Sequence, residues 1–244
     1  MTGAVKRPQK KTEPVRPEPT LVAPRRAAAF YDLEGTLCST NIVHTYGYFA
    51  RNQPTFVKSI VKTASTFVQV PFFAAADQYS RKVFNELFYR RYKGESEDRL
   101  KLMAEEMFED VVRPGIYDQS YHMIRQSRAA GYVQVLITGA LDLLAEPVAR
   151  HLGMDVFVAN ELEYVDGYAT GRIKQPLLAG ATKATWMRQY AADNGFDLEQ
   201  CLAYTDSMSD LPMLTVVGKP SVINPDFRLK QLARSFDWPV LSFV

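Results

Sequence analysis

The sequence is 244 residues long, which is enough for one large domain or two small ones with a substantial core. Hydrophobic residues make up 47% of it and charged residues 23%, so the composition is that of a globular protein and not of a disordered or fibrous chain. The formal net charge is +2, and no apolar run approaches the roughly 18 residues that a membrane-spanning helix needs.

Cysteine usage and the N-terminus indicate the compartment. The two cysteines, Cys38 and Cys201, fit neither a disulfide framework nor a zinc site, so we interpret them as reduced thiols of the core. The first residues lack the apolar segment of a secretory signal. We therefore expect a cytoplasmic protein.

Residues 1–26 form a basic, proline-rich tail. They contain seven Lys or Arg against two Glu, five of the 14 prolines and few large apolar side chains, so we expect this segment to be disordered. It is either a solvated leader or an arm for an acidic partner or an anionic lipid. The rest of the chain is slightly acidic and has no nucleic-acid recognition motif, so we expect no nucleic-acid partner.

The first predicted strand, 27–31, is a short apolar run that ends at Asp32. The turn 33–36 follows it and contains Gly35. A carboxylate after a buried strand, followed by a glycine turn, lies where open α/β sheets place their chemistry. The N–H groups of this turn are expected to surround an anion.

Residues 41–112 have a helical pattern with breaks at Pro54, Pro71 and Gly94. A segment of this length is not a loop of a compact domain, so we predict an inserted helical cap over the crevice at Asp32. Its apolar residues either pack inside the cap or form a lid for a hydrophobic phosphate at a membrane surface. They comprise Phe56, Val57, Ile60, Val61, Ala64, Phe67, Val68, Phe84, Leu87 and Phe88.

Strands and helices alternate after the cap, which predicts an α/β core made of 27–40 and 113–244. The core is a mostly parallel sheet with helices on both faces. Asp166-Gly167 marks a hairpin between 161–165 and 168–173. The other strands are expected at 132–137, 156–159, 202–205, 221–223 and 240–243, and the helices at 116–130, 141–152, 182–194 and 227–235.

Polar side chains follow several of these strands. Asp32, Thr138 and Asp206 come after three of them, Asp210 lies close behind, and Lys183 opens a helix. The carboxyl ends of parallel strands share one edge of the sheet, so these groups should converge. A carboxylate can attack phosphorus, an ammonium and a hydroxyl can hold phosphoryl oxygens, and carboxylates can hold Mg²⁺. The set predicts phosphoryl transfer.

Four sequence motifs resemble those of the haloacid-dehalogenase-like (HAD) hydrolases. They are Asp32-Leu-Glu-Gly-Thr-Leu, Leu136-Ile-Thr-Gly-Ala, Lys183, and Tyr204-Thr-Asp-Ser-Met-Ser-Asp210. The helical insert after the first motif resembles subfamily IB, the phosphoserine-phosphatase-like branch. The resemblance extends from about residue 27 to the C-terminus and implies a Rossmann-like fold.

This resemblance implies a Mg²⁺-dependent phosphomonoesterase that passes through an aspartyl-phosphate. Asp32 would be the nucleophile and a metal ligand. Glu34 would be the general acid and base, with its backbone carbonyl on the metal. Asp206 would bind Mg²⁺, and Asp210 would support the metal directly or through water.

The resemblance also implies how the phosphoryl group is held. Thr138 and Lys183 would bind it with their side chains, and Gly35 and Gly139 belong to the same binding site. Lys183 would in addition shield the carboxylates from one another.

Glu34 departs from the family pattern, because the phosphatases usually carry Asp at this position. The extra methylene moves the carboxyl by about 1 Å or more, and a misplacement of that size costs on the order of 100-fold in rate. We expect a slowed enzyme. The alternative is a catalytically weakened protein that binds phosphate and Mg²⁺ and has a regulatory or partner-binding role.

The substrate is expected to be a small-molecule or lipid phosphomonoester. Phosphoserine phosphatases carry glutamates after the first motif that meet the substrate ammonium, whereas this sequence has Thr40 and Asn41 there. Phosphoserine would then lack a counter-ion and be a poor substrate. A peripheral contact with a membrane, through the cap or the tail, stays open as an alternative, as does the oligomeric state.

Overall fold

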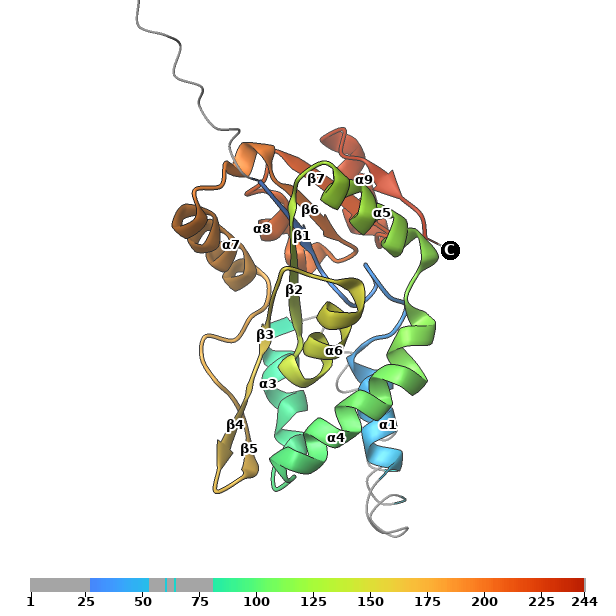
Figure 1. Cartoon of the computed structure of the whole chain (residues 1–244), viewed down its shortest axis with the longest axis vertical. Coiled ribbons are helices and arrows are strands. Elements are labelled where there is room, and N and C mark those ends of the chain that lie inside the picture. Colours follow the sequence, from blue (N-terminus) through green and yellow to red (C-terminus); the bar gives the residue numbers. More distant parts are fainter. Residues whose placement is uncertain (1–26, 53–59, 61–63, 65–80, 244) are drawn as a thin grey trace, which may run out of the picture.

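The computed structural model describes residues 27–52, 60, 64 and 81–243 of the chain (Figure 1). The predicted tail at 1–26 lies outside these residues. Most of the apolar positions predicted for the first part of the cap lie outside them as well, apart from Ile60 and Ala64, which are both exposed.

The core is a six-stranded sheet in which every neighbouring pair of strands is parallel. This confirms the predicted α/β fold class. Across the sheet the strands lie in the order β3 (Val156–Asn160), β2 (Val133–Leu141), β1 (Ala28–Tyr31), β6 (Leu202–Thr205), β7 (Lys219–Ile223) and β8 (Val240–Leu241).

The sequence of β1 explains why it occupies the middle of the sheet. Its four residues are fully buried and alternate between two hydrophobic clusters, as the side chains of a strand do. Ala29 and Tyr31 pack on the face covered by α5 and α6, and Ala28 and Phe30 pack on the face covered by α7, α8 and α9 (Figure 1). These helices span Asp118–Ala129, Asp142–Leu152, Ala181–Asn194, Leu211–Leu214 and Phe227–Ser235.

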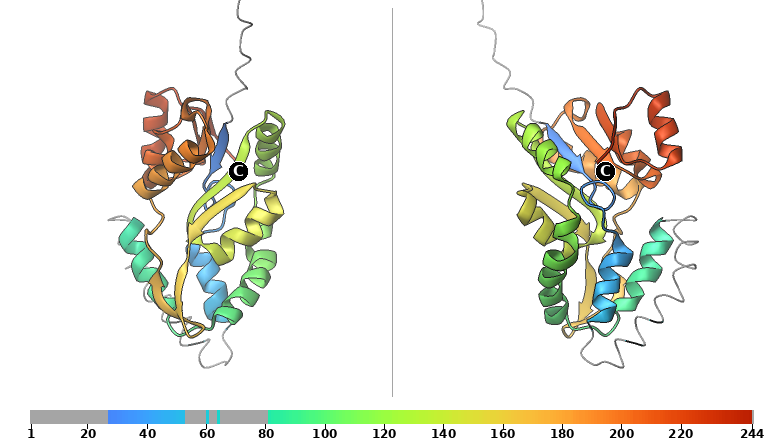
Figure 2. Two further views of the ribbon diagram at one scale, coloured as in Figure 1. Left: turned by 60° about the vertical axis from the view of Figure 1, so that its left-hand side comes forward. Right: turned by 90° about the vertical axis from the view of Figure 1, so that its right-hand side faces the viewer.

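The cap lies beyond one end of the sheet, below the core in Figures 1 and 2. Its described part contains α1, α3 and α4, with a 3-10 turn between α3 and α4 and a π-helical turn after α4. In chain order these segments are α1 (Ile42–Arg51), α3 (Arg81–Tyr89), the 3-10 turn Arg90–Tyr92, α4 (Glu97–Met107) and the π turn Phe108–Val112.

The predicted hairpin is present as β4 (Leu162–Val165) and β5 (Tyr168–Ile173). It pairs with the cap, because the Gly94 N–H donates to the Ala169 carbonyl at 2.8 Å and the Ala169 N–H donates to the Glu95 carbonyl at 2.8 Å. The hairpin therefore extends the cap in space, although it follows the core in sequence.

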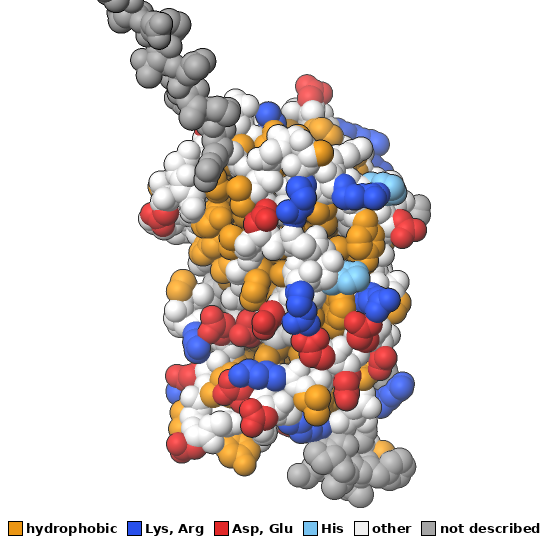
Figure 3. All heavy atoms as spheres, in the orientation of Figure 1, with side chains coloured by type: hydrophobic (Ala, Val, Ile, Leu, Met, Phe, Trp, Pro, Cys, Tyr) orange, Lys and Arg blue, Asp and Glu red, His pale blue; other side chains and the backbone are white. Residues whose placement is uncertain are grey.

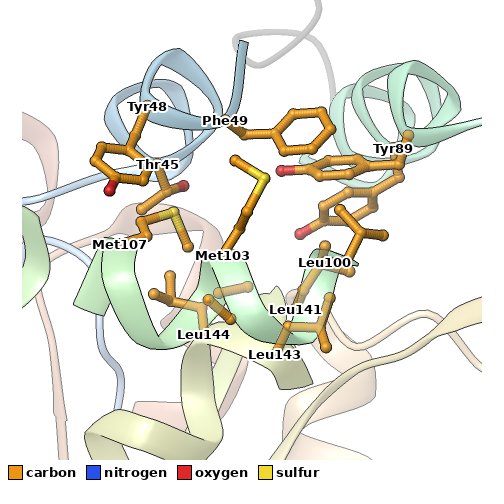
Figure 4. Close-up of a pocket in the computed structure, with 13 residues that line it drawn as sticks. Thr45, Tyr48, Phe49, Tyr89, Leu100, Met103, Met107, Leu141, Leu143 and Leu144 are labelled. Carbon is orange, nitrogen blue, oxygen red and sulfur yellow. The ribbon is translucent and has the colours of Figure 1, made fainter. Parts of the chain in front are cut away.

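Aromatic side chains fill the interior of the cap. The rings of Tyr46 and Phe88 meet edge to face at 5.1 Å between centroids, those of Phe49 and Tyr92 stack at 5.0 Å, and the Arg91 guanidinium lies 4.9 Å from the Tyr46 ring. Aromatic residues of the cap, Phe84 and Phe88 among them, thus pack inside it. They leave an apolar cavity of about 40 Å³, and Figure 4 shows the side chains of α1, α4 and α6 around it.

Cys38 and Cys201 are free and buried, as predicted. Acidic and basic side chains are interspersed on the face shown in Figure 3. No helix in the described part of the chain has the length and apolarity to cross a membrane.

Candidate active site

Asp32 and Lys183 form the centre of the site. Asp32 follows β1 directly, and its N–H donates to the Tyr204 carbonyl of β6 at 3.0 Å, so the sheet fixes its backbone. Lys183 lies in the first turn of α7, and its ammonium donates to Asp32 Oδ1 at 2.7 Å and to Asp210 Oδ2 at 2.6 Å. The three residues are 6%, 4% and 3% exposed, respectively, so this ion-pair network is shielded from water.

The charges of this network determine the protonation of the lysine. Burial lowers the pKa of the Lys183 ammonium, but the Asp210 and Asp32 carboxylates outweigh burial and raise the pKa overall. The Thr205 hydroxyl adds a hydrogen bond to Asp210 at 3.3 Å. A permanently charged ammonium beside a buried carboxylate is suited to stabilise anionic phosphoryl oxygens.

Gly35 allows Asp206 to approach the first turn. Its φ angle is +78°, and a Cβ atom here would lie 2.1 Å from Asp206 Oδ2, so no other residue fits without displacing that carboxylate. The Thr36 hydroxyl donates to Asp206 Oδ1 at 3.2 Å. The Gly35 N–H donates to the Cys38 carbonyl at 2.8 Å, so Gly35 contributes space here while its N–H serves the turn.

The carboxylates at this edge are crowded. Burial is the main cause that raises the pKa of Asp206 to about 7, and the negative charge of Asp32 is the next. Among the described residues, no three His, Cys, Asp or Glu side chains form a complete metal-binding group. Mg²⁺ is usually bound by one or two carboxylates together with water and phosphate oxygens. A divalent cation would offset the repulsion between the carboxylates at this edge, so these oxygen ligands fit Mg²⁺.

Thr138 and Gly139 lie within β2, which extends to Leu141, and not after it as predicted. The pairing of β2 with β3 is irregular between Ile137 and Leu141, and this irregularity includes both residues. The Thr138 hydroxyl is fully buried and accepts a hydrogen bond from the Ala140 N–H at 3.0 Å.

The Gly139 carbonyl is held from two sides. It accepts hydrogen bonds from the Tyr89 hydroxyl of the cap at 2.7 Å and from Asn160 Nδ2 of β3 at 2.8 Å. This segment of β2 is therefore the place where the core strand and the cap helix α3 meet.

A small cavity of about 20 Å³ lies at this meeting point, and most predicted site residues enclose it. Asp32, Glu34, Gly139, Lys183 and Asp210 line its wall. The other predicted residues, Gly35, Thr138 and Asp206, are not among the residues that line it. The wall also contains residues that were not predicted from the sequence: Asn85, Ala179, Ser207 and Ser209.

Some of the cavity residues that were not predicted could have been identified from the sequence. Ser207 and Ser209 lie inside the last motif, and their hydroxyls are 2.8 Å apart, so they could have been selected with it. Asn85 is a polar residue within the apolar run of the cap, next to Phe84 and three residues before Phe88. Residues three positions apart share a helix face, so Asn85 should be buried together with Phe88.

A buried aspartate at the end of the central parallel strand, bound by a charged lysine, is an arrangement suited to an enzyme that acts on phosphate esters. The model of the haloacid dehalogenase-like hydrolase family matches residues 29–215. The chain belongs to this family. It is 32% identical over 241 residues to a probable phosphatase of Mycobacterium tuberculosis, with 96% of this chain and 81% of that protein covered.

A second relative is phosphoserine phosphatase SerB1 of Mycobacterium tuberculosis, which is 33% identical over 225 residues, with 89% of this chain and 71% of that protein covered. Among solved structures, a phospho-aspartyl intermediate analogue of phosphoserine phosphatase has the same fold, with a TM-score of 0.67 and 17% identity over 90% of this chain and 94% of that chain. The protein described here is a phosphatase of this family.

Proposed function

We propose that the protein is a Mg²⁺-dependent phosphomonoester hydrolase that works through an aspartyl-phosphate on Asp32. The observation that carries this proposal is the ammonium of Lys183, which lies 2.7 Å from Asp32 and 2.6 Å from Asp210 at the wall of one cavity. This contact orients the nucleophile and places a positive charge where phosphoryl oxygens would arrive.

The first half-reaction transfers the phosphoryl group to the protein. A carboxylate oxygen of Asp32 attacks phosphorus, and the bond from phosphorus to the leaving oxygen breaks. Glu34, which lines the same cavity, gives its proton to that leaving oxygen, so an alcohol departs.

The second half-reaction releases inorganic phosphate. The Glu34 carboxylate takes a proton from a water molecule, whose oxygen attacks the phosphorus of the aspartyl-phosphate. The bond between phosphorus and the Asp32 oxygen breaks, which restores the Asp32 carboxylate and the Glu34 acid.

The remaining residues hold the ion and the phosphoryl group. The side chains of Asp32 and Asp206 and the backbone carbonyl of Glu34 would bind Mg²⁺, which would neutralise charge on the phosphoryl oxygens. Asp210 has Lys183 as its partner, and we assign it the task of positioning that ammonium.

The phosphoryl oxygens are assigned to three groups. Lys183 would hold them with its ammonium, Thr138 with its hydroxyl and Gly139 with its backbone N–H. The hydroxyl of Thr138 already accepts a hydrogen bond from the Ala140 N–H, which leaves its own proton to donate.

The substrate is proposed to be a small phosphomonoester other than phosphoserine. The cavity is small, at about 20 Å³, and Thr40, which follows the first motif, is buried with its hydroxyl 3.0 Å from Cys38 Sγ. Neither Thr40 nor Asn41 offers a charge to a substrate ammonium. The cap at 41–112, together with the hairpin, would close over the core formed by 27–40 and 113–244.

A phosphoester screen tests the proposal. Release of inorganic phosphate should be measured for sugar, nucleotide, lipid and aromatic phosphates and for phosphoserine, with Mg²⁺ and with EDTA. We expect Mg²⁺-dependent turnover of at least one ester and little turnover of phosphoserine. Turnover that is unchanged in EDTA, or saturation by micromolar phosphoserine, would contradict the corresponding part of the proposal.

Glu34→Asp tests the acid and base assignment. The shorter side chain restores the residue that the family usually carries, so we expect an equal or higher kcat on p-nitrophenyl phosphate. A collapse of kcat would show that the site is built around the longer carboxylate of Glu34.

A further inference from the structure

Asn85 is the one residue of the described cap helices that lines the catalytic cavity. It lies in the middle of α3, and its side chain is buried, with 2% of the residue exposed. Its amide nitrogen Nδ2 is shielded from water and has no hydrogen-bond partner among the described residues. A buried donor without an acceptor costs stability, so its presence at a catalytic cavity calls for a ligand.

The Gly139 carbonyl cannot serve Asn85 as an acceptor. The Asn85 Nδ2 atom is 3.5 Å from the position that a Cβ on Gly139 would occupy, so the amide lies over this residue. The Gly139 carbonyl already accepts hydrogen bonds from Tyr89 and Asn160, which use both of its lone pairs. The Asn85 amide nitrogen therefore remains available to a group that enters the cavity.

The lining of the cavity indicates what that ligand is. The cavity is small, at about 20 Å³, and Asp32 and Lys183 belong to its wall. A group held against Asp32 and Lys183 is the transferring phosphoryl group, and its anionic oxygens are strong hydrogen-bond acceptors.

We propose that the Asn85 amide donates a hydrogen bond to a non-bridging oxygen of the transferring phosphoryl group. This inference rests on the proposed function and adds a phosphate-binding residue from the cap. Because Asn85 belongs to α3, a bound phosphoryl group connects the cap to the core. The cap then recognises the group that every substrate shares, and not the leaving alcohol.

The test compares Asn85→Leu with Glu86→Gln. Leucine removes the donor and stays apolar, whereas Glu86 is the neighbouring exposed residue on the same helix and is the matched control. Affinity for orthovanadate and for inorganic phosphate should be measured with Mg²⁺ present. The ratio kcat/KM should be measured for p-nitrophenyl phosphate and for glycerol phosphate, whose leaving groups differ.

Asn85→Leu should weaken both anions roughly 10- to 100-fold, the effect expected for one hydrogen bond to a charged group. The ratio kcat/KM should fall by a similar factor for both esters, and Glu86→Gln should change neither quantity. The thermal midpoint of the ligand-free protein should stay equal or rise, because an unpaired donor has been removed.

Several outcomes would overturn the inference. Unchanged anion affinity in Asn85→Leu would do so, and so would a loss confined to one ester, which would show that Asn85 contacts the leaving group. If the leucine variant does not fold, Asn85→Asp replaces it in the test, because aspartate keeps the shape of the side chain. Its carboxylate should repel the anions and weaken their binding further.

Failure of the proposed function is a separate result. A wild-type chain that binds vanadate but hydrolyses no ester would contradict the hydrolase proposal, and the two affinity measurements would still decide the role of Asn85. A wild-type chain that binds neither anion would overturn the Asn85 assignment itself.

Discussion

The edge of the sheet at Asp32 and the interior of the cap are both shielded from water, but they are stabilised by opposite means. At the edge, Lys183 lies between two carboxylates and is 4% exposed. In the cap, the rings of Tyr46 and Phe88 are 0% and 1% exposed and contact each other and their aromatic neighbours. The edge of the sheet depends on the pairing of opposite charges. The interior of the cap depends on the apolar area that is buried and on how well the rings fit together.

This difference predicts how each region responds to substitution. Removal of one partner of a buried ion pair leaves a charge without compensation, whereas loss of one contact among aromatic rings leaves the others in place. Substitutions at the edge should therefore affect chemistry and stability together. Conservative substitutions in the cap should have smaller and more local effects.

The largest expected effect follows from Asp32→Asn. The amide is not a nucleophile, so turnover of p-nitrophenyl phosphate should fall below about 1% of wild type, the scale at which loss of the attacking group is felt. Lys183 keeps Asp210 as its partner, so the variant should remain folded by circular dichroism. Residual turnover well above that level in a clean preparation would remove Asp32 from its proposed role.

Lys183→Met should show how strongly the edge depends on charge pairing. Asp32 and Asp210 would face each other without the ammonium, and breaking a buried pair costs about 3–5 kcal/mol, which lowers the thermal midpoint by roughly 6–20 °C. The matched control is Lys174→Met, whose pair with Glu161 is 59% and 51% exposed, and whose loss should leave the midpoint nearly unchanged. An equal decrease in the thermal midpoint of the two variants would show that the buried ion pair contributes no more to stability than the exposed one.

Asp206→Asn should stabilise the metal-free protein. Burial and the Asp32 charge raise the pKa of Asp206 to about 7, against about 3.9 in the unfolded chain. The folded state then keeps a proton that the unfolded state releases, so wild-type stability falls as the pH rises from 4 to 7. Asparagine does not titrate, so the variant should gain of the order of 1–2 kcal/mol in EDTA, or about 2–8 °C, and gain more at pH 8 than at pH 5.

The same Asp206→Asn variant separates metal binding from this stabilisation. Thermal midpoints in EDTA and in millimolar Mg²⁺ are compared by differential scanning calorimetry. We expect Mg²⁺ to raise the midpoint of the wild type and to have little effect on the variant, since a carboxylate ligand is missing. An equal response of both proteins to Mg²⁺ would exclude Asp206 as a ligand.

Tyr89→Phe should have the smallest effect. It removes the hydroxyl that donates to the Gly139 carbonyl at 2.7 Å but leaves the bond from Asn160, so we expect a loss of about 1 kcal/mol and a decrease in kcat/KM of a few fold. Tyr48→Phe is the control in the same cap, because that hydroxyl has an exposed partner, Asp110. Kinetics on p-nitrophenyl phosphate and thermal denaturation distinguish the two variants.

The sheet was predictable because its strands are short apolar runs that end at polar residues. The run before Asp32 became β1 within one residue, and the run before Asp206 became β6. Four motifs in order then sufficed to place Asp32 and Lys183 at one edge. The positions of the strands and of the polar residues that follow them are encoded in short stretches of sequence, so they could be predicted without knowledge of long-range contacts.

Other features could not be predicted, for physical reasons. Thr138 lies inside β2 because that strand continues through an irregular pairing that composition does not encode. The hairpin joins the cap through backbone bonds between Gly94, Glu95 and Ala169, and such bonds leave no side-chain pattern. Asn85 was missed because a single amide within an apolar helix has the same sequence signal whether it meets a ligand or another side chain.

The peptide group between Gly139 and Ala140 links the cap to the hydroxyl of Thr138. Tyr89 donates to its carbonyl, and its N–H donates in turn to Thr138 Oγ1. Hydrogen bonds in such a chain polarise one another, so a bond made at one end strengthens the donor at the other. The contact of α3 with the Gly139 carbonyl would thereby increase the acidity of the Thr138 hydroxyl and strengthen the hydrogen bond that this hydroxyl can donate.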